Sequence, residues 1–306
     1  MRLALAGDTM LGRGVAKELG RRRPDSFVDP AIAELTRAAD LFVLNLECCI
    51  SERGEPVPEK VFTFRAPPAA IEVLLHLGAD CVTLANNHAL DYGTDAFLDT
   101  LAFLRDAGIA CAGAGADVEE ARSPVVVRGL PIVAFADHEP GFAAGAGCPG
   151  IAFADLREGV PAWLRDLAPG GLVCPHWGPN MQPSPLPQVR AAAHELRGAG
   201  AALVAGTSAH VFQGVEGNVL YDLGDFLDDY ARDPVLRNDL GLLFLVEVEP
   251  DGPRRIEAVP LKLDYTFTRL ARGDEADWVR QRFREACAEL GTEAREEDGR
   301  LAIGAV

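Results

Sequence analysis

Five apolar runs of strand length, spread over the first two thirds of the chain, constrain its fold more than any other feature. Runs that are apolar almost throughout are typical of strands buried on both faces of a sheet. Helical patterns lie between them, such as Leu98, Leu101 and Leu104. This alternation predicts parallel βαβ units. The runs are Leu3 to Gly7, Leu41 to Leu46, Cys81 to Ala85, Gly171 to Pro175 and Ala202 to Gly206.

Other segments depart from the βαβ pattern. "PVVVRGLPIVAF", residues 124–135, is typical of a β-hairpin, and "LKLDYTF", residues 261–267, alternates as a half-exposed strand does. The sheet is therefore predicted to be mixed. A last amphipathic helix is expected at about 274–290, followed by a short tail. With 306 residues, 48% of them hydrophobic, and no evident linker, we expect a single domain over residues 1–306.

The net charge of −17 argues against nucleic acid or an anionic membrane as a partner, because both are bound largely through Lys and Arg. The apolar run in the opening "MRLALAGD" is too short for a signal sequence or a membrane span, which favours a cytoplasmic protein. The expected partner is a small-molecule substrate. The seven cysteines include no CxxC pair, so a disulfide framework or zinc ribbon is not expected. The oligomeric state cannot be read from the sequence.

Each of the five apolar runs is followed by residues that bind metals or transfer protons. In α/β sheets ligands bind outside the carboxyl ends of the strands, so these residues can converge although they are far apart in the chain. Carboxylate, amide and imidazole ligands suit Mn²⁺, Fe²⁺ or Zn²⁺ better than Ca²⁺. Two such ions can clamp a phosphoryl group and activate water for in-line attack. The candidates are Asp8, Glu47, Asn86, Asn87, His88, His176 and His210.

Seven stretches, taken in order, closely resemble the CapA family of poly-γ-glutamate and capsule biosynthesis proteins. They are "AGDTMLGR", "NLE", "FRAPP", "LANNHALDYG", "HWG", "GTSAHVFQGVE" and "LYDLGDF". The resemblance implies a metallophosphatase-like α/β (α+β) fold, a four-layer α-β-β-α sandwich of two mixed sheets. It also implies one or two divalent ions: Asp8 and His210 hold the first, Glu47 bridges, and Asn87 with His176 hold the second. His88 would serve as acid or oxyanion stabiliser, oriented by Asp91.

The sequence departs from this pattern at three points. Ser208 stands where the family's "HPH" triplet has a histidine, which removes a ligand of the second ion. Asp225 replaces the usual asparagine of "LGNF" and is expected to add negative charge near the mouth of the site. The third departure is the absence of the family's usual anchor or export signal.

Substrate contacts are predicted at Arg65, Ser208 and His138, and Arg13 is a further candidate clamp for a phosphate or carboxylate. Specificity is expected in the loops 140–149 and 179–187. The sequence thus predicts a metal-dependent hydrolase, specifically a phosphoesterase acting on a small phosphorylated or carboxylated metabolite. Two alternatives remain open: a single-metal Lewis-acid enzyme of amide or lyase chemistry, and a non-catalytic binding or assembly component of a polyglutamate-like pathway.

Overall fold

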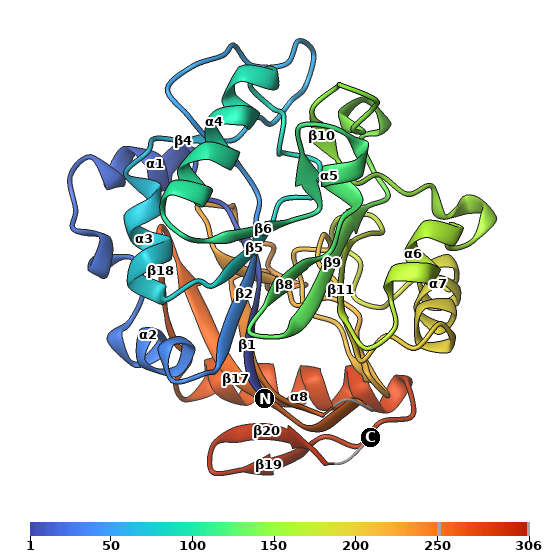
Figure 1. Ribbon diagram of the computed structural model, residues 1–306. Coiled ribbons are helices and arrows are strands. Elements are labelled where there is room, and N and C mark those ends of the chain that lie inside the picture. Colours follow the sequence, from blue (N-terminus) through green and yellow to red (C-terminus); the bar gives the residue numbers. More distant parts are fainter. Residues whose placement is uncertain (250–251, 305–306) are drawn as a thin grey trace.

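The computed structural model describes residues 1–249 and 252–304, and its chain folds into layers of helices around two mixed sheets (Figure 1). The first sheet has the order β19-β20-β17-β16-β1-β2-β5-β6, with β15 paired to β1 and β18 to β17. Its strands are β1 (Arg2–Thr9), β2 (Leu41–Leu46), β5 (Cys81–Thr83), β6 (Ala110–Ala112), β15 (Asp225–Leu227), β16 (Leu240–Glu249), β17 (Gly252–Asp264), β18 (Phe267–Leu270), β19 (Arg295–Glu297) and β20 (Arg300–Ile303).

The second sheet has the order β13-β14-β12-β11-β9-β8 and combines parallel with antiparallel pairs. Its strands are β8 (Val125–Val127), β9 (Leu130–Ala136), β11 (Leu172–His176), β12 (Leu203–Ala205), β13 (Val215–Glu216) and β14 (Val219–Leu220). Two small sheets pair β3 (Cys49–Ile50) with β4 (Arg65–Ala66) and β7 (Ala114–Gly115) with β10 (Gly150–Ile151).

Helices cover the outer faces of both sheets. In Figure 1, α2, α3 and α4 flank the first sheet, α6 and α7 flank the second, and α8 lies across one end. The helices are α1 (Arg13–Leu19), α2 (Pro30–Arg37), α3 (Ala70–Leu77), α4 (Gly93–Asp106), α5 (Val118–Arg122), α6 (Ala162–Leu167), α7 (Pro187–Gly198) and α8 (Asp274–Glu289). This confirms the predicted α/β class with two mixed sheets.

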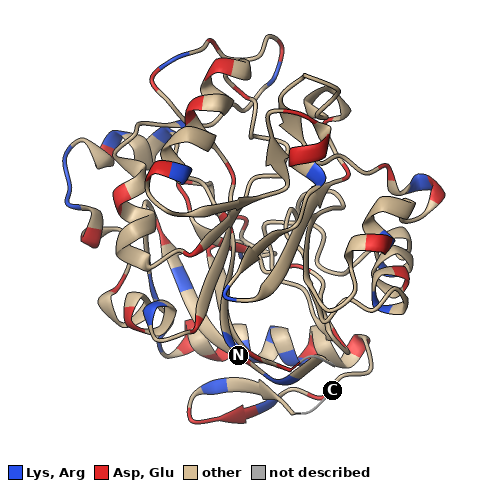
Figure 2. Ribbon diagram, in the orientation of Figure 1, with Lys and Arg blue, Asp and Glu red and all other residues tan. Residues whose placement is uncertain are grey.

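All five apolar runs form strands, and the parallel pairs β1–β2, β2–β5 and β11–β12 are present as predicted. The strand residues are almost entirely buried because helices cover one face of each sheet and the other sheet covers the opposite face. Figure 2 shows the charged residues mainly on the outer helices and loops, with the central strands largely free of them. Local signals set the helix ends: Asp29 accepts a hydrogen bond from Ala31 N at the start of α2, and Gly78, at φ 74°, ends α3.

Two predictions for the last third of the chain are wrong in detail. "LKLDYTF" is a hairpin rather than one strand: β17 and β18 pair with Asp264 opposite Phe267, and Thr266 turns the chain at φ 56°. Tyr265 is consequently 70% exposed at the turn. The predicted tail after α8 forms β19 and β20, and β20 pairs with β17 at the edge of the first sheet. Alternation of side chains cannot distinguish one strand from a tight hairpin of two.

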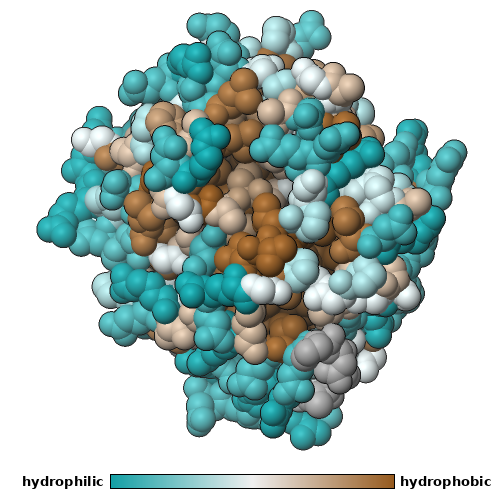
Figure 3. All heavy atoms as spheres, viewed as in Figure 1, coloured by the Kyte–Doolittle hydropathy of each residue, from teal (hydrophilic) through white to brown (hydrophobic). Residues whose placement is uncertain are grey.

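The surface viewed in Figure 3 is largely hydrophilic at its rim and apolar at its centre, over the region of β8. Val126 on β8 is 65% exposed. Here β8, the edge strand of the second sheet, lies beside β6, the edge strand of the first. The carboxyl ends of the parallel strands, by contrast, meet in a buried polar cluster.

Candidate metal centre and pocket

The predicted strand-end residues come together in one cluster that both sheets contribute to. β1, β2 and β5 of the first sheet position four of them, and β11 and the loop after β12 position the other two. A β-bulge at the end of β1 changes the register next to Asp8, as bulges beside functional sites often do. The side chains are buried: Asp8 (0% exposed), Glu47 (0%), His88 (6%), His176 (2%) and His210 (9%), with Asn87 at the rim.

Glu47 lies at the centre of the cluster. Its Oε1 atom faces the Nε2 atoms of His88, His176 and His210 at 4.0, 4.0 and 3.9 Å. These distances are too long for hydrogen bonds, and Oε1 has no hydrogen-bond partner within the described residues. Its other oxygen, Oε2, accepts a hydrogen bond of 2.9 Å from the hydroxyl of Tyr230. A buried carboxylate oxygen without a partner, facing three imidazole nitrogens, is the arrangement expected around a cation.

Asp8 is held from two directions. Its Oδ1 accepts a 2.7 Å hydrogen bond from the Asn45 amide, and its Oδ2 accepts a 3.3 Å bond from the backbone N–H of Ser208. His210 Nδ1 lies 3.4 Å from Oδ2. Burial raises the pKa of Asp8 above its ordinary value, although the charge on His210 acts in the opposite direction.

Asp225 belongs to this cluster, which corrects the expectation that it lies near the mouth. It is 1% exposed, pairs with Asp8 in the register of β1 and β15, and accepts a 2.8 Å hydrogen bond from His210 Nδ1 through Oδ1. Its Oδ2 has no hydrogen-bond partner within the described residues. One ligand atom each from Asp8, His210 and Asp225 lie within 4.8 Å of one another, which is compatible with a shared ion.

His176 and Asn87 form the other side of the cluster. His176 Nε2 lies 3.0 Å from Asn87 Oδ1, and its Nδ1 lies 2.9 Å from the hydroxyl of Thr207. Burial, together with the positive charge of neighbouring histidines, lowers the pKa of His176 well below its ordinary value. A neutral imidazole with one nitrogen held by Thr207 is suited to metal coordination through the other.

The donor set fits a divalent ion. Burial, together with repulsion from Asp8, raises the pKa of Glu47 well above its ordinary value, and burial with repulsion from Asp228 and Asp8 does the same for Asp225. A cation bound between these carboxylates would remove the repulsion. Oxygen and imidazole ligands without a nearby thiolate are those preferred by Mn²⁺, Fe²⁺ and Zn²⁺. Cys48 and Cys49 are fully buried, and burial raises the pKa of both thiols, so neither supplies a thiolate.

His88 and Asp91 are in contact, as the resemblance implied. His88 Nδ1 lies 2.6 Å from Asp91 Oδ2, which also accepts the backbone N–H of Phe64 at 2.7 Å. Lys60 forms an ion pair of 2.7 Å with Asp91 Oδ1. Burial lowers the pKa of His88 below its ordinary value, and the hydrogen bond and charge of Asp91 act in the opposite direction. The imidazole is also stacked on Phe64, with ring centroids 4.0 Å apart.

Ser208 and His138, two predicted substrate contacts, lie in contact with each other. His138 Nε2 lies 2.8 Å from Ser208 Oγ, and His138 Nδ1 pairs with Asp137. Ser208 is 1% exposed, has the strained backbone angle φ 115°, and its hydroxyl also donates to Gly178 O at 2.9 Å. Neither residue lines the pocket described next.

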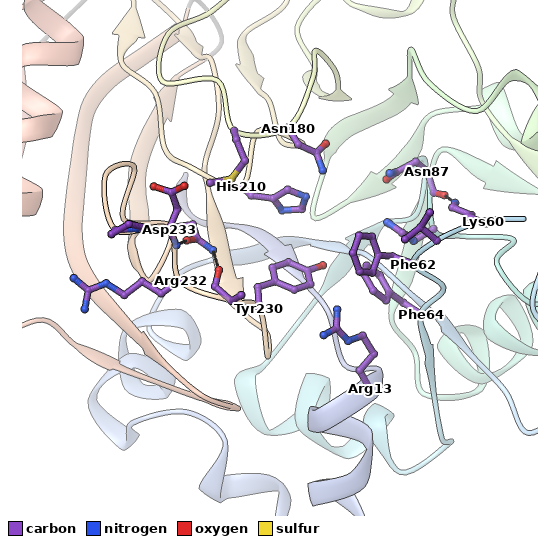
Figure 4. A pocket seen from close by; sticks show the side chains of 16 residues that line it. Arg13, Lys60, Phe62, Phe64, Asn87, Asn180, His210, Tyr230, Arg232 and Asp233 are labelled. Carbon is purple, nitrogen blue, oxygen red and sulfur yellow. Dashed lines mark hydrogen bonds between the residues drawn. The ribbon is translucent and has the colours of Figure 1, made fainter.

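A cavity of about 660 Å³ opens in front of the cluster (Figure 4). Arg65 does not line it: its guanidinium donates to the backbone carbonyls of Arg53 and Gly54 and lies over the ring of Tyr92. Arg13 lines the cavity in its place. The wall residues include Arg13, Lys60, Val61, Phe62, Phe64, Asn87, His88, Asn180, Met181, His210, Tyr230, Arg232 and Asn238.

Sequence reasoning overlooked several residues of the site. Asn45 bonds Asp8 and stands out only as the polar residue within "LFVLNL"; Tyr230 bonds Glu47 but lies in an acidic stretch without a recognisable pattern. The loop 179–187 contributes Asn180 and Met181 to the wall, as expected, whereas the loop 140–149 contributes none of the wall residues. Residues 60–64 and 230–238 form most of the mouth.

Comparisons with known proteins find similarity to proteins named for capsule and polyglutamine synthesis. Residues 2–230 match the family model described as bacterial capsule synthesis protein PGA_cap. A probable polyglutamine synthesis accessory protein of Mycobacterium tuberculosis is 33% identical over 82% of this chain and 73% of its own length. The PGA biosynthesis protein CapA of Bacillus subtilis is 28% identical over 85% of this chain and 71% of its own length. The capsule biosynthesis protein CapA of Bacillus anthracis is 24% identical over 85% of this chain and 67% of its own length. Within the described residues, no helix combines the length and apolarity needed to cross a bilayer.

Proposed function

The chain belongs to the bacterial capsule synthesis protein PGA_cap family, and from this premise we propose that it is a metal-dependent phosphoesterase acting on a small phosphorylated or carboxylated metabolite. We further propose that it serves a biosynthetic pathway related to that of its polyglutamate-associated relatives, in the cytoplasm. The net charge of −17 supports a small-molecule partner rather than nucleic acid or a membrane surface.

The observation that carries the proposal is the position of Glu47. Its unpartnered Oε1 faces three imidazole nitrogens between 3.9 and 4.0 Å away, and two of these histidines, His88 and His210, line the cavity. Asp8, His210 and Asp225 would hold one ion and Asn87 with His176 a second, with Glu47 between them. When bound, the ions would act as Lewis acids on a phosphoryl oxygen and promote ionisation of the attacking water.

The chain's own groups would then position the substrate and move protons. Asp91 fixes His88 through Nδ1, which leaves Nε2 directed at the cluster and able to exchange a proton with the leaving group. Tyr230 holds Glu47 Oε2 and so fixes the orientation of its carboxylate. Phe64 and Tyr230 form part of the wall beside His88 and Glu47, where they limit access of water.

One specific observation favours a second candidate. The tightest group of potential ligands, Asp8, His210 and Asp225, suffices for one ion, while Ser208 supplies no imidazole to a second. A single ion would act as a Lewis acid for amide or lyase chemistry. The word "accessory" in the name of a mycobacterial relative also supports a non-catalytic binding component.

Metal content and turnover of the purified full chain separate these functions. About two ions per chain, together with hydrolysis of p-nitrophenyl phosphate, would support the phosphoesterase. One ion per chain would support the Lewis-acid enzyme, and a chain that binds no ion would support the binding component. Glu47→Gln should lose both bound metal and turnover, because it removes the central charge. Glu72→Gln, on an exposed residue of α3, is the matched control and should keep both. A Glu47→Gln protein with full metal content and activity would show that the proposed centre is wrong.

A further inference from the structure

Arg13 occupies an unusual position at the cavity. It is the first residue of α1 and has a φ of 49°, a conformation that costs a non-glycine residue free energy. Figure 4 shows its guanidinium directed between the rings of Tyr230 and Phe64. The guanidinium carbon lies 5.9, 5.8 and 6.0 Å from the ring centroids of Phe62, Phe64 and Tyr230. A strained residue held among three aromatic rings in a cavity is a candidate for ligand binding.

The donors of Arg13 are mostly unused. Its Nε lies 3.4 Å from Asp229 Oδ1, and Asp229 is itself held by the backbone N–H of Gly14 at 2.8 Å through Oδ2. Asp229 therefore contacts the guanidinium from one side only. Within the described residues, the terminal nitrogens of Arg13 form no hydrogen bond, and the side chain is 39% exposed and therefore accessible to a ligand. A guanidinium whose terminal N–H groups are not hydrogen-bonded can bind a carboxylate or phosphate through two parallel hydrogen bonds.

The other cations of the wall are engaged or point elsewhere. Lys60 pairs with Asp91 and donates to the backbone carbonyl of Asn87. Arg232 lies 3.4 Å from Asp239, and Figure 4 shows its side chain directed away from the cavity. Among the described residues that line the cavity, Arg13 therefore provides the accessible positive charge, in a chain whose net charge is −17.

Arg13 is linked to the metal centre through the aromatic wall. Phe64 lies between Arg13 and His88, on which it stacks. Tyr230 lies between Arg13 and Glu47, to which its hydroxyl is hydrogen-bonded. Phe62 and its neighbour Val61 are 60% and 85% exposed at the same mouth. Exposed apolar side chains beside a free cation suit a ligand that has an apolar body and an anionic end.

We propose that Arg13 forms a second anion subsite, so that the substrate carries two anionic groups. One group binds at the metal centre, and the second, a carboxylate or a phosphate, binds Arg13, while the spacer between them lies against Phe62. This inference rests on the proposed function, because it takes the cavity as the substrate site of a metal centre.

The test compares ligands that differ only in the second anionic group. Phenylphosphonate, its 3- and 4-carboxylated forms and benzene-1,4-diphosphonate are titrated calorimetrically into the full chain loaded with Mn²⁺, which needs no turnover. A charge-assisted hydrogen-bond pair should tighten binding about tenfold or more over phenylphosphonate. The carboxylated and diphosphonate ligands show which anion the subsite prefers.

In Arg13→Gln, the ratio of the dissociation constant of phenylphosphonate to that of a ligand with a second anionic group should fall to about one. Arg13→Lys, which keeps the charge but lacks the planar fork, should retain only part of the gain. Arg232→Gln removes an equal charge from a side chain that is directed away from the cavity and is the matched control, which should keep the wild-type ratio. Circular dichroism of each variant verifies that it is folded.

Two sets of outcomes would overturn the subsite: no gain from any second anionic group, or a gain that persists in Arg13→Gln. Failure of the proposed function is distinguishable. If a carboxylated ligand binds in an Arg13-dependent way but phenylphosphonate does not bind, the subsite stands and the phosphoryl site is wrong. If none of the ligands binds, both proposals are wrong.

Discussion

At the residue scale, His88 is the side chain whose chemistry the structure defines most closely. Asp91 bonds its Nδ1 at 2.6 Å, and its Nε2 faces Glu47 Oε1 at 4.0 Å. We expect His88→Asn to lower kcat by about 10²–10⁴-fold, the usual contribution of a positioned acid or base. Metal content should stay nearly constant, because the proposed ion ligands are other residues. Steady-state kinetics with elemental analysis of the same samples checks both parts.

Asp91→Asn is the companion to this prediction. It should produce a smaller loss of kcat in the same direction, since an amide at this position no longer stabilises the intended tautomer of His88. A His88→Asn variant that folds, binds metal and turns over normally would assign His88 to a purely structural role in the turn after β5.

Ser208 is the second residue whose environment leads to a prediction. It is buried at φ 115°, and His138 fills the space beside its hydroxyl. Ser208→His should therefore lower the free energy of unfolding by about 1–3 kcal/mol, because a larger side chain must fit a strained and occupied position. In combination with His138→Ala the imidazole gains room, and occupancy of the weaker metal site should rise.

Urea unfolding and metal analysis of the single and double variants test this arrangement. His138→Ala alone serves as the control for the loss of its contact with Ser208. If Ser208→His by itself is as stable as wild type and already binds more metal, His138 does not fill the space that a histidine side chain at position 208 would need.

At the scale of elements, the site depends on how closely β1 approaches β15. A Cβ atom on Gly7 would lie 1.8 Å from the carbonyl oxygen of Gly224, and the neighbouring N–H of Asp8 donates to that same oxygen at 2.9 Å. Gly7→Ala would force the two strands apart and displace Asp8 and Asp225 together. We expect a loss of stability of about 3 kcal/mol or more, accompanied by loss of bound metal.

The matched control for Gly7→Ala is Gly198→Ala at the exposed end of α7. A Cβ there meets no atom within 4 Å, so alanine should be neutral or stabilise by up to about 1 kcal/mol. Denaturant unfolding and metal analysis of both variants are sufficient. Wild-type stability in Gly7→Ala would mean that β1 and β15 are not held at the described distance.

At the scale of the whole molecule, the buried carboxylates couple metal binding to pH. Burial, the largest cause in each case, raises the pKa values of Asp8, Glu47 and Asp225, so the metal-free protein holds protons that the unfolded chain would release. The free energy of unfolding of the metal-free protein should therefore fall as the pH rises. The fall begins near the ordinary carboxyl pKa values of the unfolded chain and continues through the raised pKa values of the folded protein. Bound metal requires the ionised forms and should reverse this trend.

The linkage is measured by titrating Mn²⁺ into the metal-free chain in buffers of different ionisation enthalpy. Metal binding should release protons, and the affinity should increase with pH. Thermal unfolding should show a larger metal-dependent rise in Tm at pH 8 than at pH 6. A binding enthalpy that is independent of the buffer would contradict the raised pKa values, and with them the described packing of the three carboxylates.

The sequence by itself determined the elements and the kinds of ligand. Apolar runs and helical periodicity are local properties, and they located β1, β2, β5, β11 and β12 and the candidate ligands that follow each of them. The convergence of those residues could also be predicted, because the carboxyl ends of parallel strands lie at one edge of a sheet. The contact between His88 and Asp91, three residues apart, followed from the resemblance to a known family.

Only the tertiary structure decided which residues share a contact across long stretches of chain. Asp225 joins Asp8 because β15 pairs with β1, Tyr230 reaches Glu47 across 183 positions, and Ser208 meets His138 across 70. It likewise placed Arg13 in the cavity and committed Arg65 to backbone carbonyls. The physical reason is that strand register, sheet packing and side-chain rotamers fix such distances together, and no local pattern in the sequence records them.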